Sequence, residues 1–516
     1  MRNKILASYH SWNIGTIPVY PILFGIYPVF ALIAYNISQI DLNLAYRSLL
    51  ISLAFVISLY GILRLVLRDW QRAAIISLFW LVLFFSYGHV YMLLKNQTVL
   101  GVLIGRHRYL LAIWFGLAFL AVLISIKKAY ELSFSTRSLT VISLFLLVFP
   151  IFQIVYFQVR SYNRNSNLTF GDLEGSPTTA GQIHPDIYYI ILDGYGRSDA
   201  LNDVYQLDNS AFVQSLEERG FYVAKCSQSN YPFTQYSLAS SLNLDYLNLT
   251  SPDINNTLDF LSSNVIRRTL AEKGYTIVAF ETGFRWTQWE DADVYYTLEK
   301  RASVINNFED LYIRTTPLRV ALDYETARYF EKLVNLRETT SSLNYGTLTY
   351  ERGLHTLGSL KSVASEIESP KFVFAHLLIA HPPYVFGPNG EQVPEANTEQ
   401  EKVAHYQDAL IFLDSQIPSV IDSILAESAT PPIIIIQGDH GSPTWNEPFQ
   451  HMAILNAYYF PGHQDVLYPS ISPVNTFRVI LNSYFGYHLP LLDDVSWFGD
   501  DFPRPIFSEV GNPCEQ

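Results

Sequence analysis

Long stretches without a charged residue dominate the first third of this 516-residue chain. A bilayer core about 30 Å thick is crossed by a helix of about 20 apolar residues. The uncharged runs are Ile14–Tyr35, Ser48–Leu63, Ala73–Leu94, Tyr109–Ile126 and Ser138–Val159. Buried helices of a soluble protein would rarely supply five such runs within 160 residues. The sequence therefore predicts a five-helix membrane anchor over residues 1–160.

The Lys and Arg residues of the short loops predict which side of the membrane each loop faces. With the N-terminus in the cytoplasm, eight basic residues lie on the inner side and four on the outer side, and an inner excess is the usual bias. Five spans then place everything after Val159 outside the cytoplasm. We expect a multi-pass protein of a plasma or inner membrane, with its C-terminal domain on the extracytoplasmic side.

Charge separates the anchor from the rest of the chain. Residues 1–160 carry 13 basic and 3 acidic side chains, a net +10, and the whole chain carries −13, so residues 161–516 carry −23. Such an acidic domain offers no basic stripe for nucleic acid. The chain has only two cysteines, Cys226 and Cys514, so a thiolate metal cage is excluded, whereas a single bridge between them stays open.

Beyond the anchor, the pattern of apolar residues predicts an α/β domain. Residues 161–185 are rich in Asn, Ser, Gly and Thr and are interpreted as a tether. In residues 186–516, continuous apolar strands such as Asp186–Leu192 and Pro432–Ile436 alternate with helical segments. This alternation is typical of a mostly parallel central sheet covered by helices on both faces.

Polar clusters follow three of the predicted strands, at Ile191–Gly196, His376–Tyr384 and Gln437–Gly441. Sites in such sheets form beyond the carboxyl ends of the strands. Asp193, Asp439 and His440 there supply carboxylate oxygens and an imidazole nitrogen, a set that suits one Mn²⁺, Zn²⁺ or Mg²⁺ ion, with Ca²⁺ also open. Each residue alone is more simply a turn acid or a core histidine, but their coincidence at strand ends favours a metal site.

Thr234 is the candidate nucleophile. Pro232 and Phe233 precede it, and Gln235–Leu244 can form a helix for which Thr234 would be the N-cap. The positive end of a helix and its free N–H groups suit a phosphate or sulfate ester. A metal-bound hydroxyl at this place also loses its proton more readily. Taken alone, an ordinary capping threonine is the simpler interpretation.

Together these motifs resemble the membrane-anchored sulfatase-like branch of the alkaline phosphatase superfamily, which includes lipoteichoic acid synthases and phosphoglycerol and phosphoethanolamine transferases. The matching segments are Asp193 in YIILDGYG, Thr234-Gln-Tyr-Ser237, His381-Pro-Pro-Tyr384 and Asp439-His440-Gly441. The resemblance implies a metal held by Asp193, Thr234, Asp439 and His440. It also implies that Thr234 is the nucleophile and that His381 contacts the substrate.

Four further residues are weaker candidates. Arg285 and Trp286 in ETGFRWTQW follow another strand end and resemble a Trp and an Arg that bind phosphate and headgroup in relatives, although a surface loop over a buried ring is equally compatible. His376 is either a second substrate contact or a core histidine. His451 lies eleven residues past His440, near an additional histidine of the relatives, so it is a candidate for a second metal or for substrate.

The implied function is metal-dependent transfer of a phospholipid-derived headgroup, of the phosphoglycerol or phosphoethanolamine type, in a bacterial membrane. The donor is a membrane lipid, the acceptor is a surface glycan or lipid, and the intermediate is a phosphothreonine. A phosphodiesterase or an atypical sulfatase would use the same residues, but no Cys/Ser-x-Pro-Ser-Arg motif is present for the usual sulfatase route. A non-catalytic membrane scaffold is the third class, and the intact set of acids, threonine and histidine argues against it.

Overall fold

The contacts within the computed structural model divide the chain into two units. The helical unit comprises Met1–Arg160 and Val304–Leu343, and the sheet unit comprises Ser161–Ser303 and Asn344–Gln516. The structure describes residues 18–37, 42–95, 97–99, 102–127, 132–164, 184–247, 260–298, 306–322, 345–396, 398–441, 448–499 and 506–515. Each unit is described below by itself.

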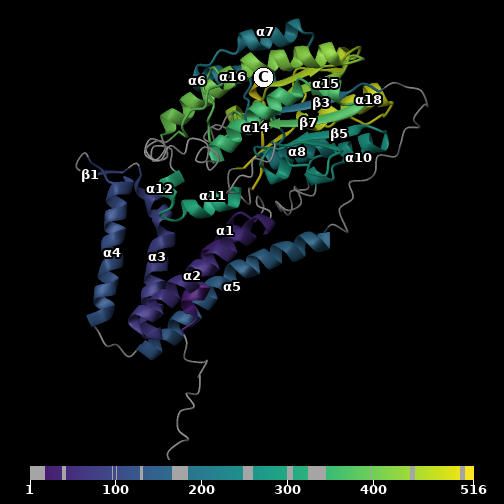
Figure 1. Cartoon of the computed structure of the whole chain (residues 1–516). Helices are drawn as coiled ribbons and strands as arrows, with labels where there is room; N and C mark the ends of the chain where they lie inside the picture. Colours follow the sequence, from purple (N-terminus) through teal and green to yellow (C-terminus); the bar gives the residue numbers. More distant parts are fainter. Residues whose placement is uncertain are drawn as a thin grey trace, which may run out of the picture. The chain divides into compact units, whose positions relative to one another are not determined.

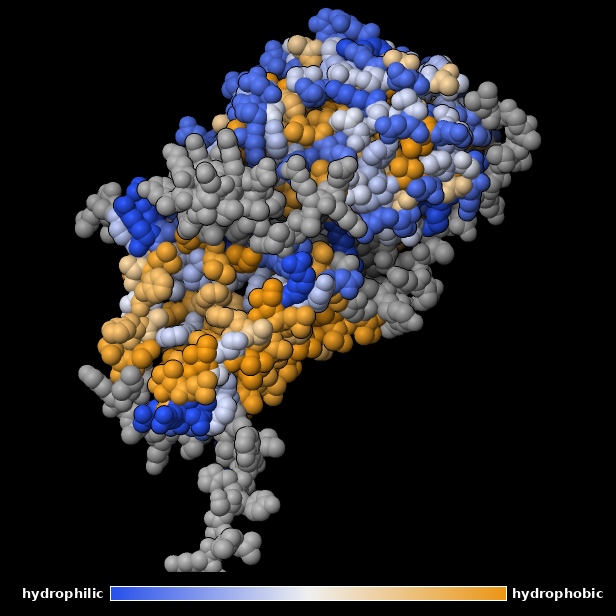
Figure 2. Space-filling view, in the orientation of Figure 1, coloured by the Kyte–Doolittle hydropathy of each residue, from blue (hydrophilic) through white to orange (hydrophobic). Residues whose placement is uncertain are grey.

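Helices form at all five uncharged runs of the helical unit. They are α1 (Tyr20–Tyr35), α2 (Tyr46–Leu67), α3 (Trp70–Leu94), α4 (His107–Lys127) and α5 (Leu132–Arg164). By length and composition α2, α3 and the middle of α5 could each cross a membrane, whereas α1 and α4 give shorter apolar segments. Figure 2 shows hydrophobic residues across the surface of these helices. A membrane region is thus present, and the number of spans stays a prediction.

The helical unit also contains α11 (Asn307–Arg314) and α12 (Arg319–Leu322), which come from the middle of the chain. The sequence pattern predicted this segment to be part of the C-terminal domain, residues 186–516. It belongs to the helical unit because Phe308 and Tyr312 are buried in the hydrophobic cluster formed with the first helices. Polar contacts add to this packing, since Glu309 pairs with Arg47 at 3.1 Å.

The sheet unit is built on seven strands in the order β4-β9-β8-β3-β7-β5-β6. The strands β8, β3, β7, β5 and β6 run parallel, whereas β9 is antiparallel to both of its neighbours. The bounds are β3 (Ile187–Leu192), β4 (Tyr222–Val223), β5 (Thr276–Phe280), β6 (Val294–Tyr296), β7 (Lys371–Leu377), β8 (Ile433–Gln437) and β9 (Asn456–Tyr459). The prediction of a mostly parallel sheet is confirmed.

Helices cover both faces of this sheet (Figure 1). Every residue of β3 is buried, and alternate side chains enter opposite cores, as the strand period of two requires. On the Tyr189 side lie α8 (Thr234–Asn243), α10 (Val265–Glu272) and α18 (Pro473–Phe485), and on the Tyr188 side lie α6 (Ser198–Tyr205), α7 (Ser210–Glu218), α14 (Tyr345–Leu360), α15 (Val363–Glu366) and α16 (Glu399–Glu427). The helix α16 is apolar enough to span a membrane, but it uses its apolar side to cover the sheet.

Short elements complete the described part of the chain. They are η2 (Leu42–Ala45), β1 (Thr98–Val99), β2 (Val102–Leu103), η3 (Arg285–Thr287), α17 (Pro448–Met452), η5 (Gln464–Val466), β10 (Ser496–Phe498), β11 (Ser508–Val510) and η6 (Pro513–Glu515). A disulfide joins Cys226 to Cys514, with their Cα atoms 5.5 Å apart. Disulfides persist in oxidising compartments, so this pair, which the sequence left open, agrees with an extracytoplasmic sheet unit.

Candidate active site

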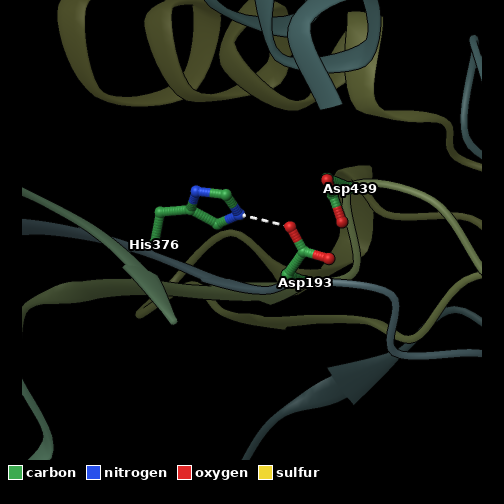
Figure 3. A group of neighbouring side chains, drawn as sticks. All are labelled: Asp193, His376 and Asp439. Atoms are coloured by element: carbon green, nitrogen blue, oxygen red, sulfur yellow. Dashed lines mark hydrogen bonds and ion pairs between the residues drawn. The ribbon is translucent and has the colours of Figure 1, made fainter. Parts of the chain in front are cut away.

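Two acids and one histidine meet at the carboxyl edge of the sheet. Asp193 directly follows β3, Asp439 lies two residues past β8, and His376 is the penultimate residue of β7. These three strands are neighbours and parallel, so their carboxyl ends lie at one edge. One ligand atom from each side chain lies within 4.8 Å of the other two, and Figure 3 shows the side chains converging.

The Asp193 carboxylate is held in place by His376. Its Oδ2 lies 3.0 Å from Nε2 of His376, and Nδ1 of that ring lies 3.0 Å from the Thr287 hydroxyl. Burial by itself raises the pKa of Asp193, but the charges of His381, His376 and His440 and the hydrogen bond from His376 outweigh it and hold the pKa well below its usual range. Asp193 is therefore ionised at neutral pH.

Asp439 presents a buried oxygen that no described group satisfies. Its Oδ1 accepts a hydrogen bond of 3.0 Å from the backbone N–H of Gly194. Its Oδ2 is buried and has no hydrogen-bond partner. Such an oxygen is costly to bury, and a cation beside Asp193 and Asp439 would offset that cost. Carboxylate oxygens with an imidazole nitrogen are ligands of divalent ions, so the residues present fit a divalent metal.

His440 faces the same two acids. Its Nε2 lies 3.6 Å from Oδ2 of Asp439 and 4.0 Å from Oδ1 of Asp193, and its Nδ1 lies 3.0 Å from the Gly441 carbonyl. Burial lowers the pKa of His440, but the two carboxylates raise it to a net value above the ordinary one. An N–H on Nδ1 that donates to the carbonyl leaves Nε2 directed at the acids, which is the orientation a metal ligand needs.

Thr234 is the first residue of α8, one position further into the helix than predicted. The N-cap is Phe233, whose extended backbone carries no side-chain cap. Because Thr234 already has helical geometry, its hydroxyl is not used as the cap, and the first N–H groups of the helix lack a capping side chain. This arrangement suits an anion better than the predicted capping threonine would.

His451 connects the Thr234 segment to the acidic cluster. Its Nε2 lies 2.8 Å from the carbonyl oxygen of Pro232, two residues before Thr234. Its ring stacks on His440 with 5.0 Å between ring centroids. The side chain is buried, and the contact orders the loop that leads into α8. A second metal at His451 stays a prediction.

The remaining candidates lie on the loop after β5 and on the segment after β7. The ring of His381 packs edge-on against that of Phe284, with 4.9 Å between the ring centroids. The charge of His381 lowers the pKa of Asp193. Arg285 is exposed, whereas Trp286 is buried with an indole N–H that has no partner. Thr287 lies in the same ETGFRWTQW stretch and was not among the predicted site residues. The packing of the sheet unit brings its hydroxyl beside His376, and no local sequence pattern indicates this contact.

No known family's sequence profile matches the chain, and no curated protein matches it. Among solved structures, it is similar to the C-terminal periplasmic domain of EcEptC from Escherichia coli in complex with Zn, at 15% identity and a TM-score of 0.42, covering 64% of this chain and 94% of that one.

A second similar structure is the integral membrane protein lipooligosaccharide phosphoethanolamine transferase A (EptA) from Neisseria meningitidis, at 13% identity and a TM-score of 0.39, covering 91% of this chain and 95% of that one. A third is a protein in the alkaline phosphatase superfamily from Vibrio parahaemolyticus, at 11% identity and a TM-score of 0.38, covering 67% of this chain and 82% of that one. The second neighbour is a phosphoethanolamine transferase and the third belongs to the alkaline phosphatase superfamily, the groups that the motifs resemble. Because the TM-scores are below 0.5, the site is interpreted below from this chain's own residues.

Proposed function

We propose that this chain is a membrane-bound, metal-dependent transferase that moves a phosphate-bearing headgroup from a phospholipid to a surface acceptor. The observation that carries the proposal is the buried Oδ2 of Asp439, which accepts no hydrogen bond from the described residues and lies beside Asp193 and His376. The apolar helices keep the enzyme at its lipid donor. The disulfide supports an extracytoplasmic position for the sheet unit.

Asp193, Asp439, His440 and Thr234 are the proposed ligands of one divalent ion, which is Mn²⁺, Zn²⁺ or Mg²⁺ in our assignment. Such an ion would lower the pKa of a bound hydroxyl and polarise a phosphoryl oxygen. We assign His376 to orienting Asp193, because its Nε2 lies 3.0 Å from that carboxylate and its other nitrogen contacts Thr287. Partners of this kind around a metal site fix the direction of the ligands.

Thr234 performs the proposed covalent step. Thr234 reacts with its hydroxyl already deprotonated. The Oγ1 alkoxide attacks the phosphorus of the donor, the bond between phosphorus and the diacylglycerol oxygen breaks, and the headgroup remains on Thr234 as a phosphodiester. The departing oxygen takes a proton from His381. An acceptor hydroxyl then attacks the same phosphorus and gives its proton to His381, the bond to Oγ1 breaks, and Thr234 is restored. The headgroup is of the phosphoglycerol or phosphoethanolamine type.

Peptide mass spectrometry after quenching a reaction with phospholipid tests the proposal. A phosphorylated adduct is expected on the peptide that contains Thr234. Thr234→Ala should lower activity by a factor of about 10³ or more, as removal of a nucleophile does elsewhere, whereas Thr234→Ser should retain part of it. Thr276→Ala, at the opposite edge of the sheet, is the matched control. An adduct elsewhere, or full activity of Thr234→Ala, would remove Thr234 from the mechanism.

Water as the acceptor would make the same site a phosphodiesterase. Incubation with phospholipid labelled in the headgroup, with and without a surface glycan or lipid fraction, separates the two reactions. Transfer predicts that label appears on the acceptor. Release of all label as the soluble headgroup in the presence of acceptor would favour hydrolysis.

A further inference from the structure

The last two strands of the chain lie along the segment that leads to Thr234. Strands β10 and β11 pair antiparallel with each other. The Trp497 N–H donates a hydrogen bond of 2.9 Å to the carbonyl of Asn230, and the Ser496 hydroxyl donates one of 2.8 Å to the carbonyl of Ser229. The C-terminal clamp, as we call this part of the chain, comprises residues 496–498 and 507–514.

Phe507 of the clamp contacts the chain on both sides of Thr234. Its ring packs edge-on against that of Tyr231, which precedes Thr234, with 5.5 Å between the ring centroids. It packs in the same way against Tyr236, which follows Thr234 in α8, at 5.4 Å. Both tyrosines are buried. One aromatic side chain from the end of the sequence thus bridges the two segments that flank the proposed nucleophile.

Phe498 of the clamp adds a contact through His451. The two rings meet edge-on, with 5.9 Å between their centroids. Nε2 of His451 in turn donates a hydrogen bond of 2.8 Å to the carbonyl of Pro232. The clamp therefore also supports the side chain that orders the loop before Thr234.

The start of α8 depends on contacts of this kind. Its N-cap, Phe233, provides no side-chain hydrogen bond, whereas a capping side chain typically contributes about 1 kcal/mol to the stability of a helix. The place of Thr234 is therefore set by the packing of the residues around it. Exact placement matters, because a displacement of about 1 Å at a reacting group can lower a rate by about 100-fold.

The disulfide between Cys226 and Cys514 holds the clamp to the rest of the sheet unit. Asn512 adds a hydrogen bond of 2.7 Å from its Nδ2 to the carbonyl of Cys226. In β11, Ser508 and Glu509 are exposed, so this strand buries little surface of its own, and an isolated pair of strands is only marginally stable in water. The covalent bond thus supplies a restraint that keeps Phe507 between the two tyrosines.

We propose, on the basis of the function assigned to Thr234 above, that the C-terminal clamp positions Thr234 for attack on the phosphorus and that the disulfide is required for this positioning. Phe507 is the main positioning residue, and it acts through Tyr231 and Tyr236. Because disulfides persist in oxidising compartments, the chain reaches its full transfer rate only outside the cytoplasm, where the proposed surface acceptor is found.

The rate at which radiolabelled headgroup from phosphatidylethanolamine or phosphatidylglycerol accumulates on Thr234 of the full chain tests the proposal. Phe507→Ala should lower this rate by about 10- to 100-fold, while the metal content and the KM for phospholipid stay at the parent values. Phe507→Tyr keeps the ring and should restore most of the rate. Glu509→Gln, exposed on β11, is the matched control. An unchanged rate in Phe507→Ala, or a fall in rate matched by an equal fall in metal content, would overturn the proposal.

The disulfide is tested by combining Cys226→Ser with Cys514→Ser, which leaves the chain without a thiol that could mispair. This double variant should lose rate to a similar extent, and a parent rate would show that the bond is not needed for positioning.

Hydrogen–deuterium exchange of the peptide spanning residues 227–236 needs no substrate and tests the clamp separately. Exchange should be faster than in the parent protein in Phe507→Ala and in the double variant, and it should be unchanged in Glu509→Gln and in the peptide that contains β8. Unchanged exchange at residues 227–236, or faster exchange throughout the sheet unit, would contradict a positioning role. If the parent protein forms no adduct on Thr234, the proposed function fails, and the exchange still decides whether the clamp orders this segment.

Discussion

Strand β3 has a buried aspartate just outside each of its ends, and the two ends differ in how that charge is compensated. At the amino end, Asp186 forms an ion pair of 2.7 Å with Lys371 and also accepts hydrogen bonds from Ser369 and from the Lys371 N–H. At the carboxyl end, Asp193 faces a second acid, Asp439, whose Oδ2 accepts no hydrogen bond from the described residues and has only the Nε2 of His440 nearby, at 3.6 Å.

This difference indicates that Asp186 has a structural role and that Asp193 and Asp439 have a functional one. An ion pair whose partners are both supplied by the chain is complete when the protein folds. The pair at the carboxyl end is incomplete, because the histidines around Asp193 leave Oδ2 of Asp439 without a hydrogen bond, which a cation from outside would replace. The carboxyl end of β3 is thus the end at which we expect the fold to depend on a ligand.

The largest expected effect is the loss of metal from the carboxyl end. Asp439→Asn keeps the size of the side chain and an oxygen for the Gly194 N–H, but it removes one charge from the ligand set. Metal analysis of the purified full chain should give about one divalent ion per parent molecule and only a small fraction of that in the variant. Asp186→Asn is the control, and a full metal content in Asp439→Asn would show that this acid is structural.

The next effect is a loss of stability at the amino end. Asp186→Asn leaves the buried ammonium of Lys371 without a counter-charge, which costs about 3–5 kcal/mol in comparable buried pairs. Denaturant unfolding should show this loss in the presence and absence of metal. Asp186→Leu combined with Lys371→Met should recover most of the stability, and a milder loss than that of the exposed pair variant Asp422→Asn would contradict the assignment.

At the carboxyl end, replacing the aspartate by asparagine should raise the free energy of unfolding, instead of lowering it, once metal is removed. In chelator-treated protein, Asp439→Asn removes a buried carboxylate oxygen that accepts no hydrogen bond. Its unfolding free energy should therefore exceed that of the metal-free parent by about 1–2 kcal/mol. With metal present, the parent should be the more stable protein. A destabilised variant under both conditions would mean that Asp439 has its stabilising partners within the chain.

A separate effect, on the pH dependence of stability, concerns a third acid, Asp414 on α16, which accepts a hydrogen bond from Tyr195 near the carboxyl end of β3. Burial raises the pKa of Asp414 to about 7. Its pKa in the unfolded chain is about 3.9, so the unfolded state loses this proton first, and the contribution of Asp414 to stability falls as the pH rises from about 4 to 7.

In Asp414→Asn, the free energy of unfolding should fall less than in the parent protein as the pH rises from about 4 to 7. Unfolding of metal-free parent and variant, followed from pH 4.5 to 8, provides the measurement, and Asp422→Asn serves as an exposed control on the same helix. An identical pH dependence in Asp414→Asn and the parent protein would show that Asp414 is already ionised throughout this range.

The apolar helices, the strand-rich domain and the acids that follow its strands could all be predicted without the structure. These features depend on local periodicity, on the length of uncharged runs and on the rule that parallel strands present their carboxyl ends together. Asp193 and Asp439 could be brought together in this way because each directly follows a run of buried strand residues.

The groups that complete the site and the packing of the middle of the chain could not be predicted, because both depend on contacts between distant residues. His376 meets Asp193 across adjacent strands, and Thr287 reaches His376 from another loop, although these residues are far apart in sequence. The segment that contains α11 packs into the helical unit because Phe308 is buried in its hydrophobic cluster. Gly88 also permits this packing, because it has no side chain to block the close approach of the Arg314 backbone. Contacts of this kind depend on long-range packing, for which a local pattern of residues carries no signal.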